Sequence, residues 1–299
     1  MVAGMIGGFI TALLFSCSYL GSAFFIRKHN SSLELLIFSQ LFMGAVSLLL
    51  LPFFIPAPDG GARLKFLLFL LVWMAAFSAA QGSFFYAQKY IESSRISSLL
   101  GLKILVLALM WMLFYGKTLN LWQSIGIVLS VIAAVGMNWS GGHFALKGVA
   151  GVAVTIICFC LTDFAGFEMV YAVGTDNIVK SGITVALFAY ALLGIVTLPF
   201  LIKVRWSRQK QLDAIPFALF WLPSQFTVLI CFGLLDPVFG NVIQASRGVI
   251  SVFLGMLACR IGLNVMECRI SKKLWIRRIL AALLMVGGIA CFSFGRISG

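Results

Sequence analysis

The sequence has very few of the side chains from which catalytic and metal sites are built. Aspartate and glutamate together number nine and histidine two in 299 residues, and charged residues make up 10% of the chain. Soluble domains have about 25% charged residues, so a soluble fold is excluded. No set of His, Cys and acid has the spacing of a metal site, and no Gly-rich phosphate loop or catalytic triad pattern is present. We therefore expect no enzyme, no metal and no cofactor.

The seven cysteines do not form a disulfide or metal framework. Most of them lie inside apolar runs, and Cys158 and Cys160 point about 200° apart on a helix. We interpret them as small packing residues. The first apolar run has no basic start and no small-residue cleavage site, so we expect it to be a retained span and not a signal peptide.

Long apolar runs dominate the chain instead. Hydrophobic residues make up 62% of it and the mean hydropathy is +1.07. A helix needs about 20 apolar residues to cross the hydrocarbon, and the runs do not alternate in polarity as barrel strands do. We therefore predict an all-α, multi-pass integral membrane protein with ten transmembrane helices. The predicted spans are 3–26, 33–55, 66–88, 96–115, 121–139, 147–171, 180–202, 215–235, 238–259 and 274–295.

The net charge of +13 does not indicate nucleic-acid binding. The cations lie at the ends of spans, where they anchor helices and meet anionic lipid headgroups, and no soluble part remains to hold a nucleic-acid interface. We expect membrane lipids and a small-molecule metabolite as partners, and a monomer.

The two halves of the chain resemble each other weakly. Trp73 and Trp221 occupy the same depth in the third and eighth spans, and Lys103 and Arg247 are central in the fourth and ninth. Five spans per half is an odd number, so the second copy would be inverted in the membrane. We predict two inverted five-helix repeats, 1–144 and 145–299, an architecture common among secondary carriers.

Three charged side chains lie at bilayer depth, where each costs about 2.5–3.5 kcal/mol on insertion scales. Arg247 is interpreted either as a contact to a carboxylate or phosphate of the substrate or as half of a structural ion pair. Lys103 is either a substrate ligand or a partner of Asp163. For Asp163, three roles stay open: counter-ion, ligand of a substrate ammonium group, or carrier of a coupling proton.

Polar side chains near these charges complete the predicted substrate site. On one face of the ninth span, Gln244 and Ser251 accompany Arg247 at helical spacing. The alternative role for Gln244 and Ser251 is a structural one in a helix contact, and the alternative role for Ser224 and Thr227 is packing. The remaining predicted lining residues are Ser224 and Thr227 in the eighth span, Gln81 and Tyr86 in the third, and Tyr19 in the first.

At this point the chain resembles the EamA-like ten-helix carriers of the drug/metabolite transporter superfamily. The resemblance covers essentially the whole chain and rests on the span count and on a loose pattern around the fourth and last spans. The residues of that pattern are Phe84-Phe85-Tyr86-Ala87, Lys89-Tyr90, Ser93-Ser94-Arg95, Tyr115-Gly116-Lys117, Gln123-Ser124-Ile125-Gly126, Glu267 and Ser271.

The resemblance implies a secondary active transporter in the bacterial inner membrane that works by alternating access. Neighbouring positive and negative charges suit an amino acid or a related zwitterionic or anionic compound, with protons as the coupling ion. Two alternatives stay open. One is a carrier of phosphorylated or nucleotide-like anions, because the phosphate-carrying branch of the superfamily has cations on the fourth and ninth helices. The other is a non-transporting scaffold or lipid-binding protein whose internal charges pair with one another.

Two signals in the sequence indicate opposite orientations in the membrane. Of the 22 lysines and arginines, 15 follow odd-numbered spans, and the positive-inside rule would then place both termini outside. The family resemblance implies cytoplasmic termini, which we adopt as the prediction.

Overall fold

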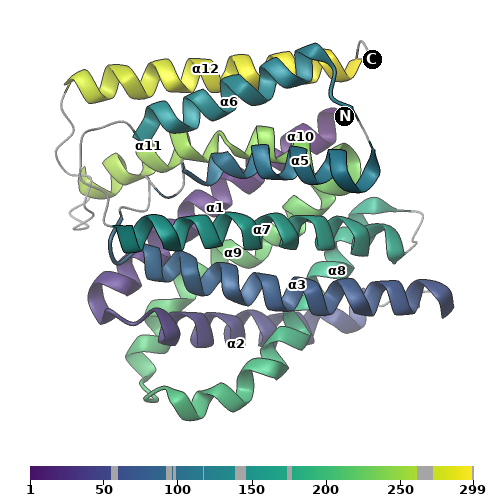
Figure 1. Ribbon diagram of the computed structural model, residues 1–299. Helices are drawn as coiled ribbons and strands as arrows, with labels where there is room; N and C mark the ends of the chain where they lie inside the picture. The colour runs from purple at the N-terminus through teal and green to yellow at the C-terminus, as the bar shows by residue number, and fades with distance from the viewer. Residues whose placement is uncertain are drawn as a thin grey trace.

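The computed structural model is a bundle of helices that lie side by side (Figure 1). It describes residues 1–54, 60–91, 96, 99–116, 118–138, 146–173, 177–260 and 272–297, and these residues contain no strand. Several residues of the resemblance pattern lie outside this part of the chain, namely Ser93, Ser94, Arg95, Lys117, Glu267 and Ser271.

The α-helices cover almost all of the described chain. They are α1 (Val2–His29), α2 (Ser32–Leu50), α3 (Gly60–Ala87), α5 (Lys103–Tyr115), α6 (Leu121–Asn138), α7 (Leu146–Ala172), α8 (Ile178–Thr197), α9 (Arg208–Leu235), α10 (Pro237–Gln244), α11 (Arg247–Arg260) and α12 (Lys272–Ile297). Short 3₁₀ helices are η1 (Leu51–Phe53), η2 (Leu100–Leu102) and η3 (Leu198–Lys203).

Each of the ten predicted spans coincides with a helical segment. Within the described residues, seven helices are long and apolar enough to cross a membrane: α1, α2 with η1, α3, α7, α8 with η3, α9, and α10 with the first part of α11. Three shorter apolar helices occupy Leu100–Tyr115, Leu121–Ala133 and Leu283–Gly295. Helix α1 begins and α12 ends on the same side of the bundle, the right-hand side in Figure 1.

The helices pack in pairs from distant parts of the sequence. Helix α3 packs along α7, α1 along α9, α2 along α8, and α6 along α12. Glycine permits the closest of these crossings, because a Cβ atom on Gly44 of α2 would lie 2.5 Å from the Cα of Gly194 in α8. Small residues at such crossings are the usual solution for helices that associate in lipid.

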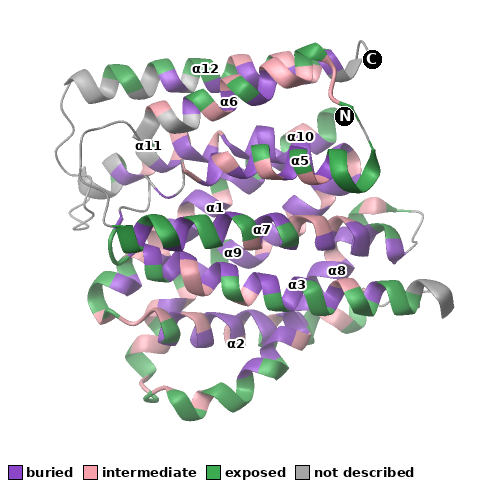
Figure 2. Cartoon of the chain, in the orientation of Figure 1, coloured by how far each residue is buried: buried purple, intermediate pink, exposed green. Residues whose placement is uncertain are grey.

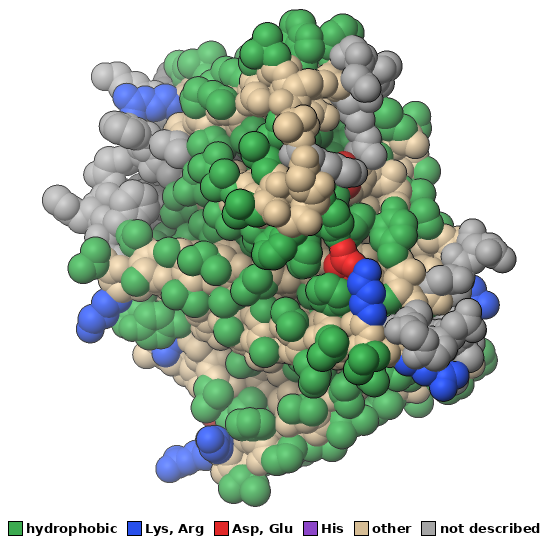
Figure 3. Space-filling model, turned by 45° about the vertical axis from the view of Figure 1, so that its right-hand side comes forward, with side chains coloured by type: hydrophobic (Ala, Val, Ile, Leu, Met, Phe, Trp, Pro, Cys, Tyr) green, Lys and Arg blue, Asp and Glu red, His purple; other side chains and the backbone are tan. Residues whose placement is uncertain are grey.

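The surface has the polarity of a membrane protein. Figure 2 shows each long helix buried along one side and exposed along the other. The face in Figure 3 is mostly hydrophobic, with lysine and arginine near its left and right borders. Large apolar side chains stay exposed in mid-helix, among them Leu67, Leu71 and Ile157. Such side chains are suited to contact with lipid tails.

Two helices are discontinuous where the sequence predicts continuous ones. The predicted span 238–259 is helical but interrupted, because α10 ends at Gln244 and α11 begins at Arg247. The backbone N–H groups of Ser246 and Gly248 bond to carbonyl oxygens three residues back, at 3.1 Å in both cases. This tighter 3₁₀ winding is typical of functional hinges within helices.

The predicted span 96–115 has a matching discontinuity. Its described residues Ile96 and Leu99 are α-helical, the 3₁₀ helix η2 follows at Leu100–Leu102, and α5 begins at Lys103. Lys103 and Arg247 are therefore each the first residue of an α-helix that begins near the middle of its predicted span. The apolar composition of both runs hides the breaks.

The start of α10 is fixed by local capping. Asp236 follows α9 directly, and its side chain accepts a hydrogen bond of 2.8 Å from the backbone N–H of Phe239, while Pro237 occupies the first turn. Proline tolerates that position because it has no N–H to leave unbonded. This cap sets the register of α10 and so places Asn241 beside α7.

Candidate functional site

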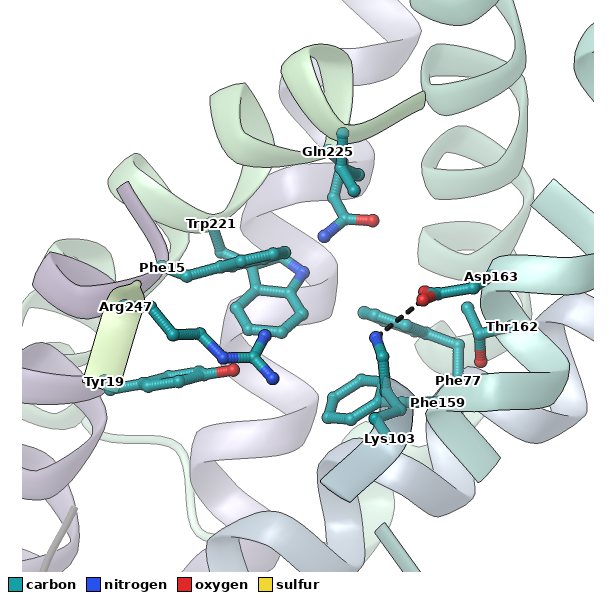
Figure 4. Close-up of a pocket in the computed structure, with 11 residues that line it drawn as sticks. Phe15, Tyr19, Phe77, Lys103, Phe159, Thr162, Asp163, Trp221, Gln225 and Arg247 are labelled. Atoms are coloured by element: carbon teal, nitrogen blue, oxygen red, sulfur yellow. Dashed lines mark ion pairs between the residues drawn. The ribbon is translucent and has the colours of Figure 1, made fainter. Parts of the chain in front are cut away.

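A pocket lies in the middle of the bundle, between α1, α3, α5, α7, α9 and α11 (Figure 4). In this conformation it is a narrow space of about 20 Å³ that is partly open to its surroundings. Its lining residues are Phe15, Tyr19, Phe77, Lys103, Phe159, Thr162, Asp163, Trp221, Gln225, Val228 and Arg247.

One wall of the pocket contains a buried ion pair. The Nζ of Lys103 lies 2.6 Å from Oδ2 of Asp163, with side chains 5% and 11% exposed. The side-chain amide of Asn241 donates a second hydrogen bond to the same oxygen, at 2.7 Å, and the ammonium group lies 5.6 Å from the centre of the Phe159 ring. The counter-ion role for Asp163 therefore fits this geometry, and the pair has no net charge.

Arg247 supplies a second cation that has no such partner. It is 3% exposed, yet no carboxylate within the described chain forms an ion pair with it, and its Nε atom has no hydrogen-bond partner there. In Figure 4 the guanidinium group points into the pocket, next to the hydroxyl of Tyr19. A buried charge without a partner is costly, so this group is the strongest indication of an anion site in the pocket.

Aromatic rings form the rest of the walls and pack on Trp221. The centroid of the Trp221 ring system lies 4.9 Å from that of Phe15, 5.9 Å from Phe77 and 6.0 Å from Phe159. The indole N–H donates a 2.6 Å hydrogen bond to the hydroxyl of Tyr190. Trp221 consequently offers the pocket an apolar face.

Four of the sequence-predicted site residues line this pocket together: Lys103, Arg247, Asp163 and Tyr19. They come from four different helices, which the sequence could only suggest through matching depth.

The other predicted residues lie outside the lining. Ser224 and Thr227 hydrogen-bond to carbonyl oxygens of their own helix, and Ser251 donates to the hydroxyl of Ser16 at 3.1 Å. These contacts fit the packing role that the sequence left open for them.

The lining also excludes two buried glutamines, Gln81 and Gln244, and one exposed tyrosine, Tyr86. Both glutamines are fully buried, and their amide atoms have no partner among the described residues. Tyr86 is 40% exposed and bonds to the hydroxyl of Tyr90.

Sequence reasoning missed the aromatic lining. Phenylalanine is too abundant, at 28 residues, to mark a site by itself. A usable signal is the spacing, since an aromatic residue precedes a polar one by four positions on four helices. These pairs are Phe15 and Tyr19, Phe77 and Gln81, Phe159 and Asp163, and Trp221 and Gln225.

Comparison with known proteins agrees with this picture. The model of the EamA-like transporter family matches residues 2–139. No curated protein matches the chain. A solved structure titled "Crystal structure of protein" is 16% identical, with a TM-score of 0.68, and the alignment covers 97% of this chain and 96% of that chain.

The two matches support different statements. At 16% identity the solved structure shows a shared fold alone, and it does so across both halves of the chain. The family match confirms the resemblance predicted from the sequence. Residues 2–139 therefore match the EamA-like transporter family of the drug/metabolite transporter superfamily, and the apolar helices indicate a multi-pass membrane protein.

Proposed function

We propose that this protein is a secondary active transporter that moves a small organic metabolite by alternating access. The substrate is an amino acid or a related zwitterionic or anionic compound. The observation that carries the proposal is Arg247, a buried cation without an ion-pair partner in the described chain, in a pocket where Lys103 is already neutralised by Asp163. A guanidinium group binds a carboxylate through two parallel hydrogen bonds.

The helix contacts support two inverted repeats of five spans, 1–144 and 145–299. Exchanging the halves converts the α1–α9 contact into the α7–α3 contact, and both pairs pack extensively. Helices α2 and α8 correspond to each other in the two halves, as do α6 and α12, so the exchange leaves the α2–α8 and α6–α12 contacts unchanged. The start of α1 and the end of α12 on one side of the bundle (Figure 1) fit an even number of crossings such as ten.

Hydrogen bonds repeat at a constant separation of 144 positions. The Thr11 hydroxyl bonds to that of Thr227 at 2.7 Å, and the hydroxyls of Thr155 and Ser83 bond at 2.8 Å. Thr11 and Thr155 are 144 apart, as are Ser83 and Thr227.

The same separation relates the contacts that hold the two cations. The Ser16 hydroxyl donates to the backbone carbonyl of Arg247 at 3.1 Å, and the Cys160 thiol donates to that of Lys103 at 3.5 Å. Both members of each pair are again 144 apart. Trp221 pairs in this way with Phe77 and not with Trp73, the match that depth alone suggested.

A site at the interface of inverted repeats, next to discontinuous helices, is the arrangement from which alternating access is built. Rocking one half against the other would expose the pocket to one side and then to the other. Asp163, which is the acid of the pocket, is the natural carrier if a proton is the coupling ion.

The alternatives fit these contacts less well. A phosphorylated substrate with two negative charges would need both cations, and Lys103 is engaged by Asp163 at 2.6 Å. A non-transporting protein whose internal charges neutralise one another would pair Arg247 with an acid, and no such pair occurs among the described residues. The unpaired guanidinium group therefore favours a substrate.

The proposal predicts that purified protein is stabilised by small carboxylates or amino acids in a thermal-shift screen. A ligand at a hundred times its Kd adds about 2.7 kcal/mol to the free energy of unfolding, which a melting curve detects. Neutral sugars of similar size serve as the control. Stabilisation by lipids alone, with no response to any metabolite, would contradict the proposal and favour a lipid-binding protein.

A further inference from the structure

Residues that lie 144 positions apart in the sequence correspond to each other in the two halves of the pocket. Their side chains are of the same chemical kind at every such pair named above except one. Residues 144 positions apart pair an aromatic ring with an aromatic ring (Phe77 and Trp221) and a cation with a cation (Lys103 and Arg247). The exception is Tyr19, whose counterpart is Asp163. One cation therefore has a carboxylate beside it, and the other has a phenol in the equivalent place.

We propose that the substrate carboxylate binds between the guanidinium group of Arg247 and the hydroxyl of Tyr19, where it is the counterpart of the Asp163 carboxylate on Lys103. This rests on the proposed function and narrows its substrate class to a monocarboxylate. Arg247 and Tyr19 are 3% and 2% exposed, so both donors are held away from water. Figure 4 shows them pointing to the same part of the pocket.

The charges of the pocket set the charge of the ligand. Lys103 and Arg247 contribute two positive charges and Asp163 one negative charge, which leaves a single positive charge for a ligand to neutralise. A single carboxylate satisfies it, whereas a phosphate dianion brings more negative charge than the pocket can balance.

The same contacts disfavour a substrate ammonium group. Such a group would need Asp163, but the Oδ2 atom of that residue already accepts from Lys103 at 2.6 Å and from Asn241 at 2.7 Å. The neighbouring ammonium group of Lys103 would also repel it. The pocket therefore favours an anion over a zwitterion.

The part of the ligand outside its carboxylate would contact the aromatic rings of the pocket. Phe15 and Tyr19 are stacked with an interplanar angle of 8° and centroids 6.1 Å apart, and Trp221 presents its face because its N–H bonds to Tyr190. An apolar, flat body next to the carboxylate fits these walls.

Three compounds that share a phenyl ring but differ in their charged groups distinguish a monocarboxylate from a zwitterion and from a phosphate. They are 3-phenylpropionate, phenylalanine, which is the same acid with an added ammonium group, and phenyl phosphate. With the full-length protein in detergent, we expect 3-phenylpropionate to bind about tenfold or more tightly than either of the others, as expected when a buried charge meets the wrong partner. Equal or tighter binding of phenylalanine or phenyl phosphate would overturn the inference.

Substitutions at Tyr19 test the position of the carboxylate. Tyr19→Asp places an internal carboxylate beside Arg247 and should weaken 3-phenylpropionate binding about tenfold or more relative to the neutral control Tyr19→Asn. Similar affinities of these two variants would overturn the inference. If Tyr19→Asp does not fold, Tyr19→Phe removes the hydroxyl alone and should still weaken binding several-fold, and an unchanged affinity would overturn the inference.

The outcomes separate this inference from the proposed function. If a broad metabolite panel yields a ligand but all three phenyl probes fail, the inference is wrong and the proposed function stands. If neither the panel nor the probes bind, the proposed function itself fails and the inference with it.

Discussion

Replacing Arg247 by alanine is expected to abolish binding of an anionic substrate while leaving the protein folded in detergent. The acid of the pocket, Asp163, is bonded to Lys103, so removing Arg247 strands no carboxylate. Truncating one partner of a buried charge pair costs about 2–5 kcal/mol of binding, which corresponds to a loss of about thirtyfold or more in affinity. Ligand-induced thermal shifts measure this loss directly.

Two control variants separate charge from packing. Arg247→Met keeps much of the side-chain volume and should fold like the wild type, yet bind no better than the alanine variant. Arg247→Lys should recover part of the affinity, because a point charge replaces a planar group that bonds a carboxylate at two places. An unfolded Arg247→Ala variant that regains stability when Asp163→Asn is added would show that the charges form a structural pair, against the proposed role.

Asp163→Asn is expected to destabilise the protein strongly. It leaves the ammonium group of Lys103 buried without an acid, and breaking such a pair costs about 3–5 kcal/mol. The apparent melting temperature of the purified protein should therefore fall clearly below that of the wild type.

Adding a second substitution should reverse most of this effect. In Lys103→Met with Asp163→Asn both charges are gone, and replacing a buried pair by neutral groups is often close to neutral. A double-mutant cycle then measures the coupling between Lys103 and Asp163. An Asp163→Asn variant as stable as the wild type would contradict the counter-ion role and would favour the roles in ammonium binding or proton coupling.

The part of the fold that could be predicted from the sequence is the part that the bilayer requires, namely the helical spans. Each predicted span coincides with a helical segment, because a long apolar run in lipid has no other way to bond its backbone. The breaks before Lys103 and Arg247 did not follow, since the broken and unbroken forms bury similar apolar side chains. They depend instead on tertiary contacts such as the Ser16 bond to the Arg247 carbonyl.

From the sequence, site residues could be predicted only where burying the side chain at bilayer depth costs free energy. Lys103, Asp163 and Arg247 could be predicted, because a buried charge needs a reason. Phe77 and Trp221 could not be predicted, because an aromatic ring can face lipid, pack in the core or line a pocket. Their place became visible through the constant separation of 144 positions, which relates each of them to a partner in the other half.

The central claim is that the pocket around Arg247 is the substrate site of a carrier, and solute counterflow tests it most directly. Purified protein in liposomes would be preloaded with an unlabelled carboxylate identified by thermal shift, and uptake of the labelled compound would be followed. We predict that the internal substrate accelerates uptake in wild-type liposomes and has no effect with Arg247→Ala. Tight binding of the compound without counterflow, or equal counterflow by the two proteins, would contradict this account.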